Sequence, residues 1–80
     1  MSFDHARVIS SSDGTSAWFE LDVFAHDGVT HERPSDHAAR DEAIRRLGMS
    51  GYTLVSVTYE TDDDSAIRSE HLWFRREVAG

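Results

Sequence analysis

The sequence predicts an α+β domain of order ββαββ, in which a four-stranded antiparallel sheet carries one helix on one face. Three observations lead to this fold class. Four segments have apolar residues at alternate positions, as strands do. One central segment has its apolar residues three or four positions apart, as a helix does. Turn-forming residues separate the first two strands, and no linker or repeat divides the chain, so we expect residues 1–80 to form a single domain.

The first half of the chain contains two predicted strands joined by a tight turn. They cover residues 3–10 and 16–26, and Asp13 and Gly14 between them are typical of a hairpin. One side of the second strand is almost wholly apolar, which indicates the side that faces the core. Asp27 and Gly28 are expected to end this strand, and the polar residues 30–36 are expected to connect it to the helix. The other side of the second strand carries two aromatic rings and two carboxylates, which are Trp18, Glu20, Asp22 and Phe24.

A single helix is predicted over residues 37–47. Residues 34–36, Pro-Ser-Asp, indicate its start, because serine and aspartate side chains accept hydrogen bonds from the free amides of a first helical turn. Gly48 follows where a left-handed residue often ends a helix, and Gly51 is expected to turn the chain so that Tyr52 shields the helix end. The apolar stripe of the helix consists of Ala39, Ala43, Ile44 and Leu47.

The second half is predicted to add two more strands. Residues 52–61 are dense in β-branched and aromatic residues, and the last strand is expected near residues 69–78. The acidic residues 62–69 between them are expected to form an exposed loop. One helix can cover one face of a four-stranded sheet and leaves the other bare. The uncovered face would then carry some of the large apolar residues Trp18, Phe24, Leu54 and Trp73.

Large apolar residues on both faces of the sheet predict self-association. Soluble monomers rarely expose a contiguous apolar patch of more than a few hundred Å². A chain of 80 residues also has a small core of its own, so further burial by association would stabilise it. We therefore expect a homodimer, formed through the uncovered face or edge to edge. A further protein partner is an open alternative.

Composition argues against several classes of partner and cofactor. The formal net charge is −7, which argues against nucleic acid and anionic membranes as partners. The chain contains no cysteine, so it has no disulfide, thiolate metal ligand or cysteine nucleophile. No segment has the pattern of a signal peptide or a membrane span, which predicts a cytoplasmic location. Phosphate-binding and dinucleotide motifs are missing as well, so no cofactor is expected.

The residues around the helix end resemble a known family. They comprise Leu47, Gly48, Gly51, Tyr52, Leu54, Val55, Ser56 and Val57, followed in the last strand by Phe74 and Arg75. This pattern is similar to the family called domain of unknown function 4177, whose members usually have tryptophan where this chain has Tyr52. The resemblance covers about the C-terminal half of the chain and implies a small prokaryotic α+β domain. It implies no catalytic residue, because the family has no established activity.

The densest group of possible metal ligands lies between the second strand and the helix. His26, His31 and His37 could bind Zn²⁺ together with neighbouring carboxylates. Their spacings of five and six residues match neither a helical pair nor a two-residue ligand gap, so solvated or capping histidines are the simpler interpretation. Elsewhere, Glu20 and Asp22 point the same way along their strand. We expect them to form a cross-strand ion pair with Arg75 if that residue lies opposite.

Three functions remain open, and the first is favoured. It is a non-enzymatic, homodimerising interaction or assembly module whose specificity resides in the uncovered sheet face. The second is a small-ligand-binding protein with a pocket between subunits, lined by Trp18, Glu20 and Trp73. The third is a metal-dependent enzyme that uses the three histidines. No catalytic residue is assigned, and the candidate interface or ligand residues are Trp18, Phe24, Trp73, Glu20 and Arg75.

Overall fold

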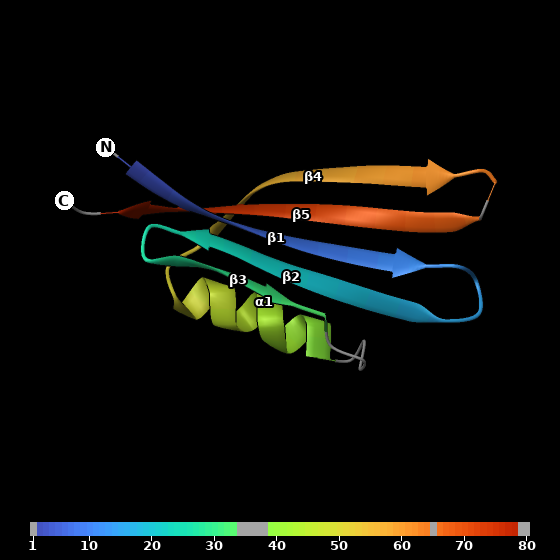
Figure 1. Ribbon diagram of the computed structural model, residues 1–80, viewed down its shortest axis with the longest axis horizontal. Coiled ribbons are helices and arrows are strands. Elements are labelled where there is room, and N and C mark those ends of the chain that lie inside the picture. Colours follow the sequence, from blue (N-terminus) through green and yellow to red (C-terminus); the bar gives the residue numbers. More distant parts are fainter. Residues whose placement is uncertain (1, 34–38, 65, 79–80) are drawn as a thin grey trace.

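The computed structural model consists of one antiparallel sheet and one helix (Figure 1). It describes residues 2–33, 39–64 and 66–78, so the predicted helix start at residues 34–36 lies outside the described part. The strands follow the order β3-β2-β1-β5-β4 across the sheet, which makes β3 and β4 its two edges. The elements in chain order are β1 (Ser2–Ser12), β2 (Ala17–Ala25), β3 (Gly28–Glu32), α1 (Ala39–Met49), β4 (Thr53–Asp62) and β5 (Ile67–Val78).

The predicted four-stranded ββαββ fold is wrong, because β3 adds a fifth strand before the helix and makes the protein mostly β. β3 lies in the segment for which the sequence predicted a polar connection. It pairs with β2 after a turn at His26 and Asp27, and Val29 lies opposite Phe24. All five residues of β3 are exposed. Its sequence, Gly-Val-Thr-His-Glu, contains one large apolar residue and so lacks the apolar alternation that identifies strands in a sequence.

The core lies between α1 and the strands β2, β1 and β5. Across the sheet, Val8 of β1 lies opposite both Leu21 of β2 and Leu72 of β5. The predicted core side of the second strand and the predicted apolar stripe of the helix are confirmed. Among the described residues, no helix is long and apolar enough to span a bilayer. The buried apolar residues are Ala6, Val8, Phe19, Leu21, Ala43, Leu47, Tyr52, Leu72 and Phe74.

Two arginines fix α1 to the sheet, one near each end of the helix. Arg40 donates from Nε to Ser10 Oγ at 2.5 Å and from Nη2 to Glu70 Oε1 at 2.7 Å. At the other end, the carbonyl oxygen of Ser50 accepts a hydrogen bond from Nη1 of Arg76 at 3.1 Å. Arg76 belongs to β5, so the central strands hold the helix at two points along its length.

The end of α1 differs from the prediction that the helix stops at Leu47. The helix continues through Gly48 to Met49, and Gly48 does not have a positive φ. The left-handed residue is Gly51, with a φ of 92°. The Gly51 amide donates to the Gly48 carbonyl oxygen at 3.1 Å, and the Tyr52 amide donates to the Leu47 carbonyl oxygen at 3.0 Å. These two bonds form a Schellman motif, so Gly51 is the residue that terminates the helix.

β4 is an edge strand whose ten residues are all exposed. A β-bulge at Val55 shifts its register against β5, and Leu54 lies opposite Phe74. Because Phe74 belongs to the core, Leu54 lies on the helix side of the sheet. The strict alternation had made Leu54 a candidate for the uncovered face, and this prediction is wrong. In the view of Figure 1, α1 lies over the β2 and β3 side of the sheet and away from β4. The apolar side chains of β4 therefore lack a covering layer on the helix side.

Candidate functional site

The sheet face opposite α1 carries all five interface or ligand candidates from the sequence. Trp18 and Trp73 are partly buried on this face, and Phe24 is 41% exposed. The candidates do not form one cluster, because β1 separates β2 from β5. Trp73 lies in the same cross-strand row as Asp22, four residues along β2 from Trp18. The two tryptophans therefore do not form a common stacking platform within one chain.

Hydrogen bonds between charged groups and a cation–π contact link one cross-strand row of side chains on this face. Its members are His31 of β3, Asp22 of β2, Arg7 of β1 and Trp73 of β5. Arg7 donates to Asp22 Oδ2 from Nη2 at 2.5 Å and from Nε at 3.1 Å, and the Nδ1 atom of His31 is hydrogen-bonded to Asp22 Oδ1. Burial by itself raises the pKa of Asp22, but the bonds from His31 and Arg7 outweigh it and lower the pKa. The Arg7 guanidinium also lies 5.2 Å from the centre of the Trp73 ring, within cation–π range.

Arg75 does not lie opposite Glu20 or Asp22, so the ion pair expected from the sequence is not formed. The intervening strand β1 keeps β5 away from β2. The Arg75 guanidinium instead lies 4.6 Å from the centre of the Phe3 ring. Glu20 is paired with Arg33, with 3.6 Å between Glu20 Oε1 and Arg33 Nε. Strand order decides this result, since cross-strand pairs form between neighbouring strands.

The histidines considered as metal ligands are not brought together. His26 contacts Asp4 on the helix side of the sheet, whereas His31 contacts Asp22 on the opposite face. His37 lies outside the described residues. In the part of the chain that the structure describes, no group of three or more histidine, aspartate and glutamate side chains is arranged to hold a metal ion. The described geometry gives the metal hypothesis no support.

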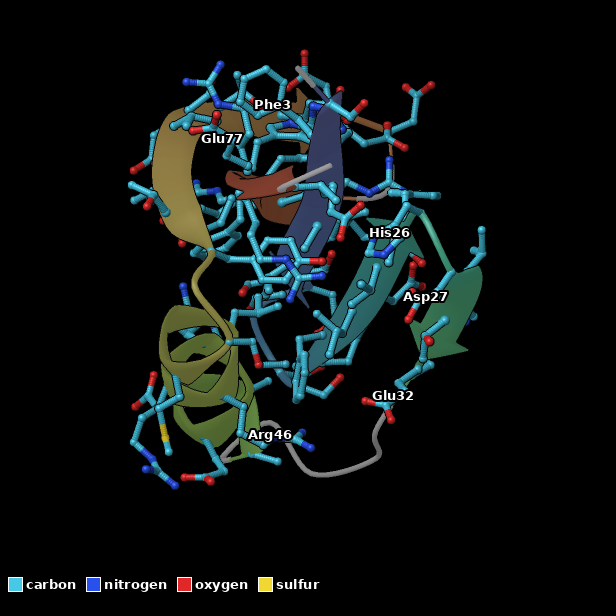
Figure 2. The ribbon with its side chains drawn as sticks, turned by 90° about the vertical axis from the view of Figure 1, so that its left-hand side faces the viewer. Phe3, His26, Asp27, Glu32, Arg46 and Glu77 are labelled. Carbon is cyan, nitrogen blue, oxygen red and sulfur yellow. The ribbon has the colours of Figure 1, made fainter. Side chains whose placement is uncertain are left out.

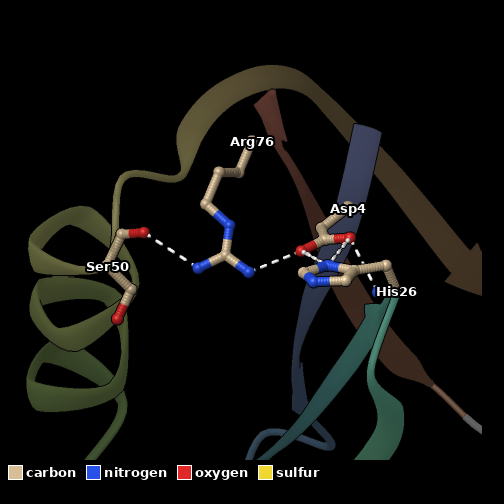
Figure 3. Close-up of polar contacts among 4 residues, drawn as sticks. All are labelled: Asp4, His26, Ser50 and Arg76. Atoms are coloured by element: carbon tan, nitrogen blue, oxygen red, sulfur yellow. Dashed lines mark hydrogen bonds and ion pairs between the residues drawn. The ribbon is translucent and has the colours of Figure 1, made fainter. Parts of the chain in front are cut away.

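A second buried carboxylate, Asp4 of β1, lies on the helix side of the sheet (Figure 3). Its side chain is 1% exposed and accepts hydrogen bonds from Arg76 Nη2 at 2.5 Å and from the backbone amide of His26 at 2.8 Å. The bond from Arg76 lowers the pKa of Asp4 to about 2, and His26 adds to this effect against the opposing effect of burial. Arg76 also covers the Tyr52 ring at 4.6 Å and reaches Ser50. Asp4 thus connects the β2–β3 turn, β5 and the end of α1.

Two charged residues at core positions are the signal in the sequence that could have identified this cluster. Asp4 shares the side of β1 that holds Ala6, and Arg76 shares the side of β5 that holds Phe74. A buried charge requires a partner of opposite charge. The two residues lie directly opposite each other once β1 pairs with β5. The pairing of these two strands was not predicted, so neither residue was selected as a candidate.

A groove on the helix side runs between α1 and the β2–β3 hairpin. It consists of two adjoining cavities of about 200 and 410 Å³, which share four lining residues. One cavity continues to Glu32 and Arg46, and the other continues to Asp27 and Tyr52. Figure 2 shows Arg46 on α1 across from Asp27 and Glu32 on the hairpin. The groove exists because β3 extends the sheet beyond the helix. The shared lining residues are Val23, Thr30, Leu47 and Ser50.

The free edge of β4 is the third surface with potential for binding. Four of its large apolar or aromatic side chains are exposed by 39 to 73%. They follow one another closely along the strand, and three of them belong to the stretch that resembles a known family. An apolar edge of this length is uncommon on a monomer, because it favours pairing with another chain. The four residues are Leu54, Val55, Val57 and Tyr59.

Comparison of the chain with protein-family models, curated proteins and solved structures gives no match. Membership of the family that the helix end and the following strand resemble therefore stays a prediction. The function has to be inferred from the three surfaces described above, namely the charged row opposite the helix, the groove beside β3 and the free edge of β4.

Proposed function

We propose that the protein is a non-enzymatic assembly module that forms a homodimer by pairing β4 with β4 of a second copy. The observation that carries this proposal is the exposed edge of β4, which is ten residues long. An exposed edge presents unpaired amide and carbonyl groups to a further strand. Natural edges are often protected by lysine, by proline or by short length. β4 contains neither lysine nor proline, and its protective features are the bulge at Val55 and the carboxylates Glu60 and Asp62 near its end.

The sequence of β4 is compatible with pairing to a second copy of itself. Antiparallel pairing about a two-fold axis brings the same surface of both copies together. With the axis close to Val57, Val55 of one copy lies opposite Tyr59 of the other. Glu60 then lies opposite Leu54 of the other copy. The carboxylates at the end of the strand stay apart from those of the second copy, so like charges do not meet.

The sheet face opposite α1 is less suited to this contact than the sequence suggested. Its aromatic rings are interleaved with charged groups that already contact them. The Arg7 guanidinium lies over Trp73, and the Arg75 guanidinium lies over Phe3. Covering this face would remove several charges from water, and the loss of their hydration opposes association. The β4 edge carries no such penalty over most of its length.

Substitution of both Val55 and Tyr59 by lysine tests the proposal. Size exclusion with light scattering should give the mass of a dimer for the wild-type protein at tens of micromolar and the mass of a monomer for Val55→Lys with Tyr59→Lys. The two positions lie opposite each other in the proposed pair, so the introduced lysines repel across the interface. A monomeric wild type, or a double variant that remains dimeric, would refute β4 pairing.

Two further variants separate loss of pairing from loss of folding. Val29→Lys places the same charge on β3, the opposite edge, and should leave the dimer intact. A variant with Val55→Glu and Tyr59→Glu should be monomeric alone and should form a mixed dimer with the double lysine variant. Recovery of the dimer mass on mixing requires that both monomers are folded. Circular dichroism spectra of the separate variants provide a second check.

A further inference from the structure

The groove between α1 and the β2–β3 hairpin has an apolar floor and polar groups at both ends. Its floor is formed by Leu21, Val23 and Leu47. Glu32 marks one end and Gly28 the other, and the β3 backbone between them spans about 13 Å. This shape fits an elongated molecule that has an apolar middle and hydrogen-bonding groups at its two ends.

The first end of the groove carries one group of each charge. Glu32 of β3 and Arg46 of α1 both line this end, on opposite sides of the groove (Figure 2). Neither side chain forms a hydrogen bond or an ion pair with another residue in the described part of the chain. A carboxylate can accept hydrogen bonds from an ammonium group, and a guanidinium can bind a carboxylate with two parallel bonds. Together they match the zwitterionic head of an amino acid.

The second end carries a carboxylate and a buried hydroxyl group. Tyr52 is 7% exposed, and its hydroxyl has no hydrogen-bond partner among the described residues. Such groups are rare in native proteins, because a buried polar atom without a partner costs free energy. Asp27 lines the same end and forms no ion pair within the described ranges. Arg76 lies there too, with its guanidinium bonded to Asp4 and within the electrostatic range of Asp27. This end is therefore suited to a cation with several N–H donors.

We infer that the groove binds a free basic amino acid, arginine or lysine. The α-amino and α-carboxylate groups contact Glu32 and Arg46, the aliphatic part of the side chain lies on the apolar floor, and the side-chain cation contacts Asp27 and the Tyr52 hydroxyl. The net charge of −7 also attracts a cation to the protein. The groove lies beside β3, at the opposite edge of the sheet from β4. This inference therefore does not depend on the proposed dimer.

Calorimetric titration of the wild-type protein with L-lysine and L-arginine tests the inference, and we expect binding of both. Two related compounds each lack one feature: L-norleucine has no side-chain cation, and 1,5-diaminopentane has no carboxylate. Each should bind at least about tenfold more weakly than L-lysine, because it loses charge-assisted hydrogen bonds at one end of the groove. No binding of either basic amino acid at millimolar concentration overturns the inference, and so does equal binding of L-norleucine.

Two variants connect the binding to this groove. Tyr52→Phe removes a buried hydroxyl that has no partner, so the melting temperature should stay the same or rise while the affinity for L-lysine falls about tenfold. Asp27→Asn should lower the affinity by a similar factor. Asp63→Asn, in the turn after β4, is the matched control and should bind L-lysine as the wild type does. Unchanged affinity in both Tyr52→Phe and Asp27→Asn overturns the assignment of the site.

Discussion

The two edges of the sheet are equally exposed, yet they differ in length and chemistry. β3 has five residues and β4 has ten. β3 contains one large apolar residue, Val29, and ends with His31 and Glu32, whereas β4 has four large apolar or aromatic residues within residues 54–59. Short length and charge are the features that prevent edge strands from pairing with other chains. The comparison teaches that exposure alone does not identify an association edge, and that length and side-chain chemistry distinguish β4 from β3.

The edges also differ in how the chain is fixed just before each strand. Before β3, the backbone amide of His26 donates to the buried Asp4 carboxylate. Before β4, the Schellman motif at Gly51 sets the direction in which the chain leaves the helix. One edge is therefore fixed by a charged cluster and the other by backbone conformation. The two attachments meet at Arg76, which is bonded to Asp4 and also contacts Ser50 and Tyr52 at the end of α1.

The largest loss of stability is expected from Asp4→Asn, which should remove the attachment of β3 to the buried carboxylate. The substitution leaves the Arg76 guanidinium without its carboxylate and weakens the bond from the His26 amide. The melting temperature should fall by more than in any other variant of this series. Amide hydrogen exchange, measured by NMR, should rise more in β3 than in β4, because β3 then opens locally. An equal rise in both edges would contradict the attachment of β3 by Asp4.

Acid should weaken the same attachment without a substitution. The pKa of Asp4 is about 2 in the folded protein, against an ordinary value of 3.8. Its carboxylate therefore stabilises the fold above about pH 4, and this contribution is lost as the pH falls from 4 towards 2. The pKa of Asp13 is also about 2, because the backbone amides of Ser16 and Thr15 donate to it. The melting temperature of the wild type should fall over this range. That of Asp4→Asn should fall less steeply, and parallel curves would exclude a role for Asp4.

A change of intermediate size in the free energy of unfolding is expected from a substitution just before β4, at Gly51. Gly51→Ala places a Cβ atom on a residue with a φ of 92° and should lower the free energy of unfolding by about 1–2 kcal/mol. Gly48→Ala is the matched control, because it lies within α1 and a Cβ atom there meets no atom within 4 Å apart from those of its chain neighbours and the helix backbone. It should raise the free energy of unfolding by about 0.5–1 kcal/mol. Urea denaturation measures both, and effects of the same sign would contradict the assignment of Gly51 as the helix terminator.

The smallest effect on stability is expected from Val29→Lys on β3. Val29 is 71% exposed, and substitutions at exposed sites usually change the free energy of unfolding by less than about 0.5 kcal/mol. Urea denaturation should therefore give the wild-type midpoint. A loss of more than about 1 kcal/mol would mean that the outer edge of β3 makes contacts that stabilise the protein. The two edges would then differ less in their contribution to stability.

The parts of the fold that could be predicted from the sequence are those that bury apolar side chains at a fixed period. Phe19 and Leu21 alternate with polar residues, and both face the core. Ala43 and Leu47 lie one helical turn apart, and both are buried against the sheet. In these segments the local pattern and the tertiary packing require the same conformation.

The parts that could not be predicted depend on which strands become neighbours or on small changes of backbone register. β3 carries no apolar period, and its pairing with β2 is supported by the distant Asp4. The position of β1 between β2 and β5 gave Asp22 the partner Arg7 in place of Arg75. The bulge at Val55 moved Leu54 to the helix side. The acidic loop was also shorter than expected, because β5 begins at Ile67. Strand order and bulges follow from the whole fold, so no local pattern indicates them.

The pairing of β1 with β5 has a consequence for how the chain reaches its folded state. The two strands pair from Ser2 opposite Val78 to Ser12 opposite Arg68, so the first strand of the sheet needs the last one as its neighbour. Contacts between residues this far apart in sequence slow folding, because a long loop must close before the contacts stabilise anything. During synthesis, β1 lacks its second neighbour until β5 leaves the ribosome. Until then β1 is an exposed edge of the nascent sheet, whereas the edges of the finished sheet are β3 and β4.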